Sequence, residues 1–216
     1  MKPSRIPFLL VAILVWPGLS NAFGQPYTPA DGDIFFQSLA RSPLGAVIEG
    51  STHSSYSHCG VLYNVNGRWF IYEAIGPVKA TRLKHWIQQG KGGRCDVFRL
   101  KEKYREKIPH FIAAIKTYMG RPYDILYDFD DEKIYCSELI FKAFRTVYGE
   151  DLGEIVTLGE LDWKPYEEFI RDIDPTLPLE RKMITPKHLS AAQQLEPVYQ
   201  SIPVEAGNAL ENKRVP

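Results

Sequence analysis

Hydrophobic residues in the first half of the chain occur in short, dense runs that are typical of β-strands. These runs are rich in Val, Ile, Phe, Tyr and Trp, the residue types that favour strands. They occupy residues 34–36, 58–64, 68–75 and 94–100. Asn66-Gly67 separates the second run from the third, and this dipeptide between two strand-like runs indicates a hairpin with a two-residue turn. We therefore expect an antiparallel hairpin over residues 58–75.

Apolar residues in the second half recur every three or four positions, which is the spacing of one face of a helix. One such stripe falls at residues 108, 111, 112, 115 and 119 and ends at Gly120. The predicted helices cover residues 43–50, 83–89, 104–119, 135–148, 165–173 and 187–193. Because strands come early and helices late, the pattern predicts an α+β fold, with a central antiparallel sheet packed by helices, rather than alternating α/β.

The N-terminal residues have the pattern of an export signal. Lys2 and Arg5 precede nine unbroken apolar residues, 8–16, and Ala22 ends a stretch of small residues suited to cleavage. A spanning helix needs about 20 apolar residues, so this run is too short to be one. We expect a signal peptide over 1–22, a mature domain over 23–199 and a loose tail over 200–216, with the mature protein in the periplasm. A retained N-terminal anchor is the alternative.

Composition narrows the classes of function. The chain has 216 residues, 44% of them hydrophobic, which is enough for one domain with a real core. Its 26 basic and 26 acidic side chains balance, which excludes a basic nucleic-acid binder. The three cysteines, at 59, 95 and 136, are too few for a disulfide scaffold and are wrongly spaced for a zinc finger.

The predicted hairpin places a histidine and a glutamate on the same face of the sheet. With a two-residue turn, Gly60 lies opposite Glu73, and His58 becomes a diagonal neighbour of Glu73 within side-chain reach. Gly60 leaves room between the two side chains. A four-residue turn would keep both residues on one face. The pair is either a structural contact or part of a catalytic site.

Cys136 falls in the first turn of the predicted helix 135–148, at the end of its apolar stripe. The positive end of a helix favours a thiolate, although a small buried hydrophobic residue is the alternative. Acidic residues at 130–132 oppose thiolate formation. A protonated imidazole would offset them, so His58 as base and Glu73 as its orienting residue would complete a nucleophile–base–orienter set.

Five short segments in this order resemble a known family. They are Gly32-Asp33-Ile34-Phe35-Phe36-Gln37, residues 52–60, residues 72–78, Gly120-Arg121-Pro122-Tyr123-Asp124 and residues 135–139. The chain resembles the YiiX-like branch of the NlpC/P60 superfamily, whose members are exported bacterial cysteine peptidases or amidases with a circularly permuted papain-like fold. The histidine segment precedes the cysteine segment, as in that permuted branch.

The resemblance implies that Cys136 is the nucleophile, His58 the base and Glu73 the orienting residue. It also suggests that the Tyr123 hydroxyl joins the Cys136 N–H in an oxyanion hole, although a core aromatic residue is an equal reading of Tyr123. Ser57 and His53, just before the base, are further candidates for contact with substrate.

Two cysteines depart from the family pattern. Cys59 and Cys95 are not expected in the family, and setting aside the nucleophile leaves them as an even pair. We consider a disulfide between them in the oxidising compartment, with two small core residues as the alternative. The remaining histidines, 85, 110 and 188, fall on predicted helices as ordinary residues.

The function that these observations predict is an exported cysteine hydrolase that cleaves an amide bond in a cell-envelope peptide through an acyl-enzyme. We expect no cofactor, no metal, no nucleic-acid partner and no transmembrane span in the mature chain. The alternatives are a lipid acyltransferase or thioesterase that uses the same three residues, and a non-catalytic envelope binding protein. A further alternative is a zinc site, since Cys, His and Glu are all competent ligands.

Overall fold

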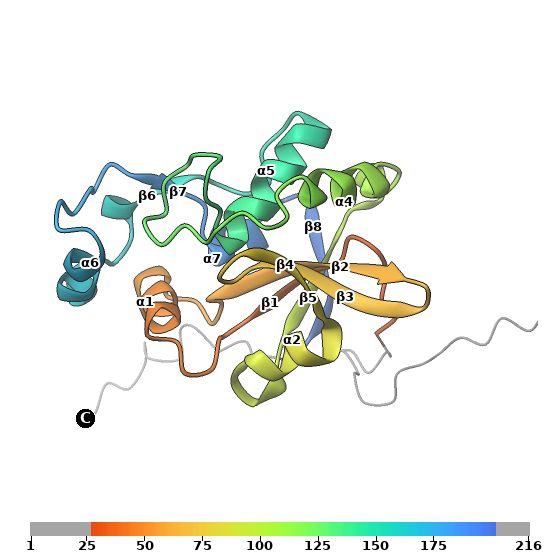
Figure 1. Ribbon diagram of the computed structural model, residues 1–216, viewed down its shortest axis with the longest axis horizontal. Coiled ribbons are helices and arrows are strands. Elements are labelled where there is room, and N and C mark those ends of the chain that lie inside the picture. The colour runs from red at the N-terminus through yellow and green to blue at the C-terminus, as the bar shows by residue number, and fades with distance from the viewer. Residues whose placement is uncertain (1–26, 202–216) are drawn as a thin grey trace, which may run out of the picture.

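A computed structural model describes residues 27–201, so the expected signal peptide and most of the expected tail lie outside the described residues. The centre of the molecule is a six-stranded sheet in the order β4-β3-β2-β1-β5-β8, with every neighbouring pair antiparallel (Figure 1). The strands are β1 Ile34–Gln37, β2 His58–Val65, β3 Arg68–Ala74, β4 Val78–Arg82, β5 Asp96–Leu100 and β8 Leu195–Gln200. A separate two-stranded sheet pairs β6 Val156–Thr157 with β7 Lys182–Met183.

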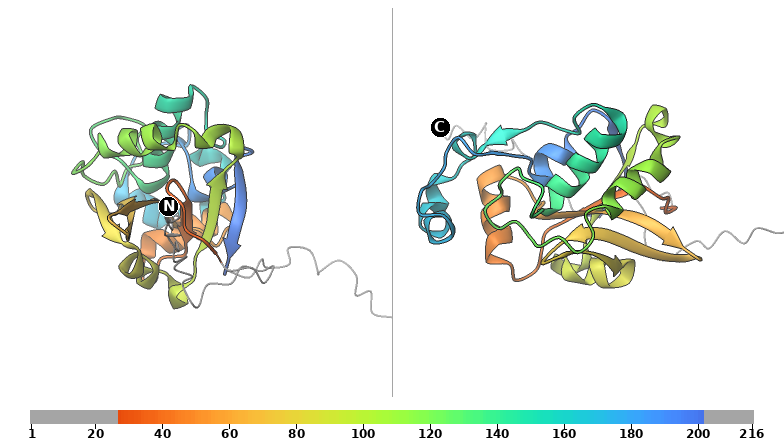
Figure 2. Two further views of the ribbon diagram at one scale, coloured as in Figure 1. Left: turned by 90° about the vertical axis from the view of Figure 1, so that its right-hand side faces the viewer. Right: turned by 45° about the horizontal axis from the view of Figure 1, so that its top comes forward.

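Helices cover both faces of the six-stranded sheet. They are α1 Pro43–Thr52, α2 Leu83–Gln89, α3 Glu102–Arg105, α4 Ile108–Lys116, α5 Cys136–Tyr148, α6 Glu167–Ile173 and α7 Pro186–Ser190. Short 3₁₀ turns lie at Lys91–Gly93, Leu158–Glu160 and Lys164–Tyr166. Figures 1 and 2 show α4 and α5 on one side of the sheet and α2 on the other, with α1 and α6 beyond one end of it.

The two faces of the sheet belong to two different cores. Alternate residues of β2, such as Cys59 and Val61, pack with α5 in the larger core. The residue between two of them, Leu62, points to the other face and packs with Ile71 and with Trp86 of α2. Because successive side chains of a strand point to opposite faces, each of these strands contributes to both cores. This explains why β2 and β3 are apolar on both sides.

The predicted hairpin is confirmed, including its register. Val65 pairs with Arg68 across a two-residue turn, in which Asn66 and Gly67 have φ values of 50° and 77°. Two successive positive φ values define the type I′ turn, whose twist matches that of the flanking strands. Gly67 adopts such an angle at no steric cost, and Asn tolerates it better than most residues.

The helix predicted over residues 104–119 divides into two, α3 and α4. Pro109 lies in the first turn of α4. Proline has no backbone N–H to donate to the preceding turn and its ring clashes there, so it is tolerated at a helix start and breaks a helix interior. The apolar residues at 108, 111, 112 and 115 lie on α4, but this helix ends at Lys116, so the exposed Met119 falls beyond it.

Two strands of the main sheet were missed by the sequence reading. β4 has only one buried residue, Val78, and otherwise reads as polar. β8 contains Pro197 and pairs with β5 alone, next to a register shift at Val97/Phe98. Both are edge strands, where proline and charged residues are accepted because one side of the strand is unpaired. Their sequences therefore lack the dense apolar signal of central strands.

A buried ion pair holds the beginning of β1 against β5. The Asp33 carboxylate, which is fully buried, accepts hydrogen bonds from Arg99 Nε at 2.6 Å and Nη2 at 2.9 Å. It also accepts one from the Tyr27 hydroxyl at 2.6 Å and one from the Ala30 N–H at 2.9 Å. Every oxygen of this carboxylate is thus satisfied, which is what makes its burial tolerable.

Asp33→Asn should therefore destabilise the protein strongly, because it removes the charge that compensates Arg99. Breaking a buried pair by removing one partner typically costs about 3–5 kcal/mol. Asp151→Asn offers a matched control, because the Asp151–Arg145 pair is about half exposed on both sides and should cost no more than about 1 kcal/mol. Urea denaturation of the two variants measures the difference, and equal losses would contradict the assigned role of Asp33.

Candidate active site

The hairpin brings His58 and Glu73 into direct contact. His58 is the first residue of β2 and Glu73 the last but one of β3. The distance from His58 Nε2 to Glu73 Oε2 is 2.7 Å, and both side chains are almost completely buried. The interaction predicted from the strand register is therefore present.

Glu73 is held from its other side by β4. Thr81 donates its hydroxyl to Glu73 Oε1 at 2.5 Å, and Lys79 is the residue paired with Glu73 across the strands. Burial acts to raise the pKa of Glu73, but the His58 contact, the Thr81 hydrogen bond and the Lys79 charge outweigh it and lower the pKa. The carboxylate is therefore ionised and accepts hydrogen bonds on both oxygens.

Gly60, two residues after His58 on β2, lies opposite Glu73, and there is no space for a side chain at this position. A Cβ atom at this position would lie 2.3 Å from Ile71 Cγ2, 2.7 Å from the Tyr72 carbonyl oxygen and 3.5 Å from Glu73 Cβ. The close approach thus involves the β3 backbone and Ile71 first, with Glu73 slightly farther away. This differs in detail from the expectation that Gly60 makes room mainly between His58 and Glu73.

Cys136 is the first residue of α5 and is buried. The helix start is held by Glu138, whose carboxylate accepts the Tyr135 N–H at 3.2 Å and lies 2.8 Å from Lys142 Nζ. Burial raises the pKa of Glu138 to about 7 despite these contacts. The arrangement places the Cys136 thiol at the positive end of the helix, where a thiolate is favoured.

The Cys136 thiol interacts with both His58 and Cys59. Its hydrogen bond with the Cys59 thiol, and then the hydrogen bond and charge of His58, lower the pKa of Cys136 well below its ordinary value, against the opposing effect of burial. For His58, burial alone would lower the pKa, but contact with Cys136 and Glu73 raises the pKa to about 9. These opposite shifts describe a thiolate–imidazolium pair, the state that an activated cysteine nucleophile requires.

Cys136 and His58 come from opposite faces of the sheet. Cys136 and its helix pack on the face that carries Cys59, whereas the His58 ring stacks on Trp86 of α2 with ring centroids 5.8 Å apart. They meet because His58 is the first residue of its strand, where the sheet ends. At that point a side chain from one face can reach a helix start on the other.

A cleft opens beside His58. It is an open cleft of about 1050 Å³, a volume that includes the solvent at its mouth, and it is lined mainly by the segment before and within α1 and the end of β3. His58, Ser57, Gln89, Tyr123 and Ile125 also line it. Substrate can therefore approach the imidazole directly.

Tyr123, the candidate oxyanion residue, lies on the cleft wall. The Tyr123 hydroxyl is 3.1 Å from the Tyr127 hydroxyl. It is also close enough to Cys136 for the thiolate charge there to raise the pKa of Tyr123. Burial raises the pKa of Tyr123 well above its ordinary value, so the phenol is a neutral donor. Tyr127, which the sequence reading missed, has a left-handed φ of 60°. A bulky residue rarely adopts this angle, so the surrounding packing must hold Tyr127 in it.

Comparison with known proteins agrees with this geometry. A family model described as "Permuted papain-like amidase enzyme, YaeF/YiiX, C92 family" matches residues 28–199. The chain belongs to this family. It is accordingly a cysteine hydrolase of the amidase type with an α+β, permuted papain-like fold, as the sequence predicted.

Two relatives extend the family assignment. "Uncharacterized protein YiiX" of Escherichia coli (strain K12) is 33% identical over 182 residues, which span 82% of this chain and 90% of that protein. A crystal structure of metalloprotein yiiX from Escherichia coli O157:H7 superimposes with a TM-score of 0.77 at 34% identity, covering 82% of this chain and all of that one. The likeness to both proteins therefore extends over most of this chain.

The yiiX protein of the crystal structure is described as a metalloprotein. We therefore tested the zinc alternative against the residues of this chain. Within residues 27–201 no group of three or more His, Cys, Asp or Glu side chains is placed to hold a metal ion. Both oxygens of Glu73 already bind protein partners, and the ring nitrogen of His58 that faces Glu73 is occupied by it. The three residues do not fit a catalytic zinc site, which uses three free ligands and a water.

Of the two other candidates for contact with substrate, Ser57 and His53, only Ser57 lines the cleft. Ser57 lines the cleft, but its hydroxyl donates to Glu49 Oε1 at 2.7 Å and accepts the Leu39 N–H at 2.8 Å. It therefore holds the cleft wall together. His53 does not line the cleft; its side chain is 72% exposed and lies 3.3 Å from Asp162.

Of the two alternatives for Cys59 and Cys95, the disulfide is absent from this structure and both are small core residues. All three cysteines are free thiols. Cys59 packs in the core on the α5 side of the sheet, whereas Cys95 packs in the core on the α2 side. The sheet itself separates them, so no rotation of the side chains would join them.

The pH dependence of Cys136 alkylation should reveal the ion pair. Because the thiolate is held by His58 and Cys59, iodoacetamide should react nearly as fast at pH 6 as at pH 8, and the rate should fall only as the pH drops through the lowered pKa of Cys136. His58→Ala removes the imidazolium and should slow labelling at pH 6 at least about tenfold. The His58 proton, held to about pH 9, keeps the pair intact across this range.

Peptide mapping after alkylation identifies the labelled residue. Cys95 provides an internal reference, because burial and the charge of Asp96 raise its pKa to about 12 and it should stay unlabelled. Labelling that rises steeply between pH 7 and 9, as for an ordinary thiol, would contradict the ion pair.

Gly60→Val should impair both stability and the site. The new side chain meets Ile71 and the Tyr72 carbonyl, so the β2–β3 ladder must shift, at a cost of about 1–3 kcal/mol. The shift also moves His58 relative to Glu73, so Cys136 should label more slowly at pH 6. Gly60→Ala should give an intermediate effect on both measurements. Native stability and native labelling in Gly60→Val would contradict the packing described here.

Proposed function

We propose that this protein is an exported cysteine amidase in which Cys136, His58 and Glu73 form a catalytic triad that cleaves an amide bond in a cell-envelope peptide. The observation that carries the proposal is the buried chain of contacts from the Cys136 thiol through His58 to Glu73. The motif order also supports placing the family within the NlpC/P60 superfamily.

The first half of the reaction follows from the ion pair. The Cys136 thiolate attacks the carbonyl carbon of the amide, and the carbonyl electrons move onto the oxygen. The Cys136 N–H, which has no partner within the helix because it belongs to the first turn, and the Tyr123 hydroxyl stabilise this oxyanion. The His58 imidazolium then protonates the leaving nitrogen, the C–N bond breaks, and a thioester on Cys136 remains.

The second half regenerates the enzyme. Neutral His58 takes a proton from a water molecule in the cleft, and the resulting hydroxide attacks the thioester carbonyl. The C–S bond breaks, the acid is released, and Cys136 returns to the thiolate paired with imidazolium. Glu73 accepts the His58 Nε2–H throughout, which leaves the other ring nitrogen facing the thiol.

Export is supported by the sequence of residues 1–22, with its basic start, apolar run and small residues before position 23. No helix within residues 27–201 is long and apolar enough to cross a membrane. We propose that the mature chain acts in the periplasm, where cell-wall stem peptides are accessible.

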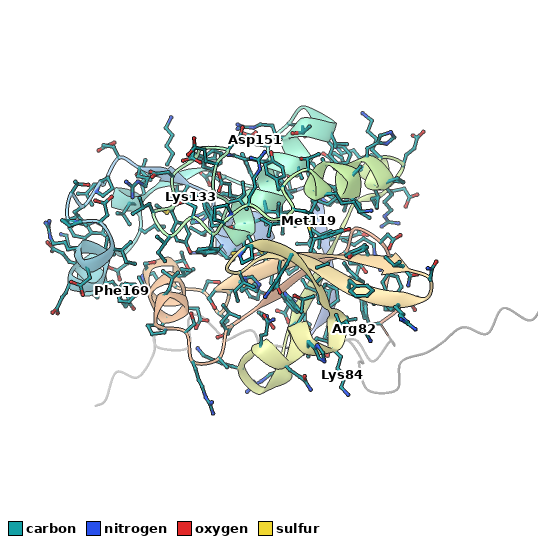
Figure 3. The ribbon with its side chains drawn as sticks, viewed as in Figure 1. Arg82, Lys84, Met119, Lys133, Asp151 and Phe169 are labelled. Atoms are coloured by element: carbon teal, nitrogen blue, oxygen red, sulfur yellow. The ribbon has the colours of Figure 1, made fainter. Side chains whose placement is uncertain are left out.

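Lipid acyl chemistry is the second candidate, favoured by an apolar groove beside the cleft. Side chains of α1, α6 and the segments near β6 and β7 line the groove. Phe169 of α6, labelled in Figure 3, is one of them. Leu44, Ile48 and Ile125 line both the groove and the His58 cleft. An acyl chain in the groove could therefore extend into the cleft beside His58.

Substitution of the triad tests the catalytic proposal. Cys136→Ala and His58→Ala should each abolish turnover, because no thiolate forms or attacks without them. Glu73→Gln keeps the shape but loses the charge, and should reduce kcat by on the order of 10–10³-fold with folding retained. Cys95→Ala, a buried thiol on the other face, is the matched control and should keep native activity. Full activity in Glu73→Gln would remove Glu73 from the triad.

A substrate panel separates the two candidate functions. Peptidoglycan stem peptides, short-chain acyl amides and long-chain acyl esters would be incubated with the protein, and the mass of the adduct on Cys136 recorded. A peptidyl adduct supports the amidase. A long-chain acyl adduct, with kcat/KM that rises with chain length and falls in Ile48→Asp, supports the lipid function instead.

A further inference from the structure

Cys59 is a second buried thiol beside the nucleophile, and the proposed reaction makes no use of it. It is the residue after His58 on β2 and is fully buried. Its thiol shares a hydrogen bond with Cys136, and its backbone also hydrogen-bonds to that residue. Free cysteines are commonly buried, but two thiols in contact inside one core have a chemistry that neither has alone.

The fold directs the two thiols toward each other. Because side chains alternate along β2, His58 points to the α2 side of the sheet and Cys59 to the α5 side. Helix α5 packs on β2 and begins at Cys136. The two cysteines therefore sit on adjacent rigid elements, with their side chains in the same core.

We propose that Cys59 and Cys136 form a reversible oxidative modification site, in which Cys59 resolves the oxidised nucleophile as an intramolecular disulfide. The proposal rests on the proposed function only in taking Cys136 to be a reactive thiolate. The oxidant is a peroxide, which is small enough to enter the cleft beside His58.

The chemistry balances in two steps. The Cys136 thiolate attacks one oxygen of hydrogen peroxide, the O–O bond breaks, hydroxide leaves, and the sulfur becomes a sulfenic acid. The Cys59 sulfur then attacks the sulfenic sulfur. An S–S bond forms, the S–OH bond breaks, and the Cys59 proton leaves with that hydroxyl as water. Two thiol groups are oxidised and one peroxide is reduced to water and hydroxide.

The state of each thiol suits its part. Cys136 is the thiolate, and thiolates are the species that peroxide oxidises. Burial and the neighbouring thiolate keep Cys59 protonated, with its pKa well above the ordinary value, so it is not itself a target for peroxide. Once Cys136 is a neutral sulfenic acid, the negative charge that held the Cys59 proton is gone. The Cys59 sulfur can then attack, and its proton leaves with the hydroxyl as water.

Disulfide formation would have two effects on the enzyme. It removes the nucleophile, so turnover stops. It also protects Cys136 from further oxidation to sulfinic acid, which is irreversible for most proteins. A thiol reductant attacks the disulfide and returns both thiols. Oxidation at this site would thus inhibit the enzyme reversibly instead of inactivating it permanently.

The test uses the purified, reduced protein with hydrogen peroxide as the probe. After treatment, remaining thiols are alkylated with iodoacetamide, and intact mass, peptide maps and recovery with dithiothreitol are recorded. The wild type and Cys95→Ala should both become lighter by two hydrogens before alkylation, with the peptides of Cys59 and Cys136 cross-linked. Dithiothreitol should restore Cys136 alkylation.

Removing the resolving thiol should change the product. Cys59→Ala and Cys59→Ser should gain two oxygens on Cys136, and the fraction of Cys136 that dithiothreitol recovers should fall at least about tenfold. Circular dichroism confirms that each variant is folded, and the serine variant is used should alanine disturb the core. Irreversible oxidation of the wild type with Cys59 still free, or a cross-link to Cys95, would overturn the proposal.

The experiment distinguishes an incorrect resolving role for Cys59 from an incorrect assignment of Cys136 as the reactive thiol. If untreated Cys136 reacts with iodoacetamide at pH 6 but peroxide yields no cross-link, the resolving role of Cys59 is wrong and the nucleophile stands. If Cys136 fails to react with either reagent, both assignments are wrong.

Discussion

The hydrogen bond between His58 and Glu73 is the interaction on which the site depends. A buried carboxylate without a partner is costly, and so is a buried imidazolium. Here each compensates the other at 2.7 Å, within a face of the sheet that is otherwise apolar. The surrounding residues are arranged around this pair: Gly60 lets β3 approach, and Thr81 satisfies the remaining oxygen of Glu73.

Glu73 determines the orientation and charge of His58, and through them the charge of the Cys136 thiol. Because Glu73 is ionised and holds one ring nitrogen, the His58 ring has a single orientation, with its second nitrogen toward Cys136. The imidazolium then stabilises a thiolate at a helix start, where the helix dipole acts in the same direction. Desolvation opposes both charges, so the ion pair persists only while all three residues remain in contact.

The end of the sheet is where these contacts become possible. Within the sheet, β2 separates the α2 core from the α5 core, and side chains on opposite faces do not meet. His58 is the first residue of β2, so its ring reaches past the end of the strand to the start of α5. Cys59 reaches the same thiol from the other face of the strand. Two successive residues of β2 therefore contact the Cys136 thiol from two directions.

Local sequence determined the elements that have a strong local cause. The Asn66-Gly67 turn set the register of the hairpin, and the register in turn placed His58 and Glu73 on one face. The apolar stripe after Cys136 predicted α5 and its buried face. The edge strands β4 and β8 escaped prediction because their exposed sides carry polar residues and proline, and so did Thr81, which β4 brings to Glu73.

Tertiary structure alone decided which cysteine meets which. The sequence contains three cysteines and no local pattern that pairs them, since the pairing depends on which face of the sheet each side chain occupies and on which helix covers that face. Alternation along β2 puts Cys59 and His58 on opposite faces of the sheet. Only the packing of α5 on the Cys59 face brings Cys59 to Cys136, and Cys95 lies in the core on the other face. Short-range patterns are set by backbone geometry within a few residues, whereas this contact joins residues far apart in the chain, which only the packed core brings together.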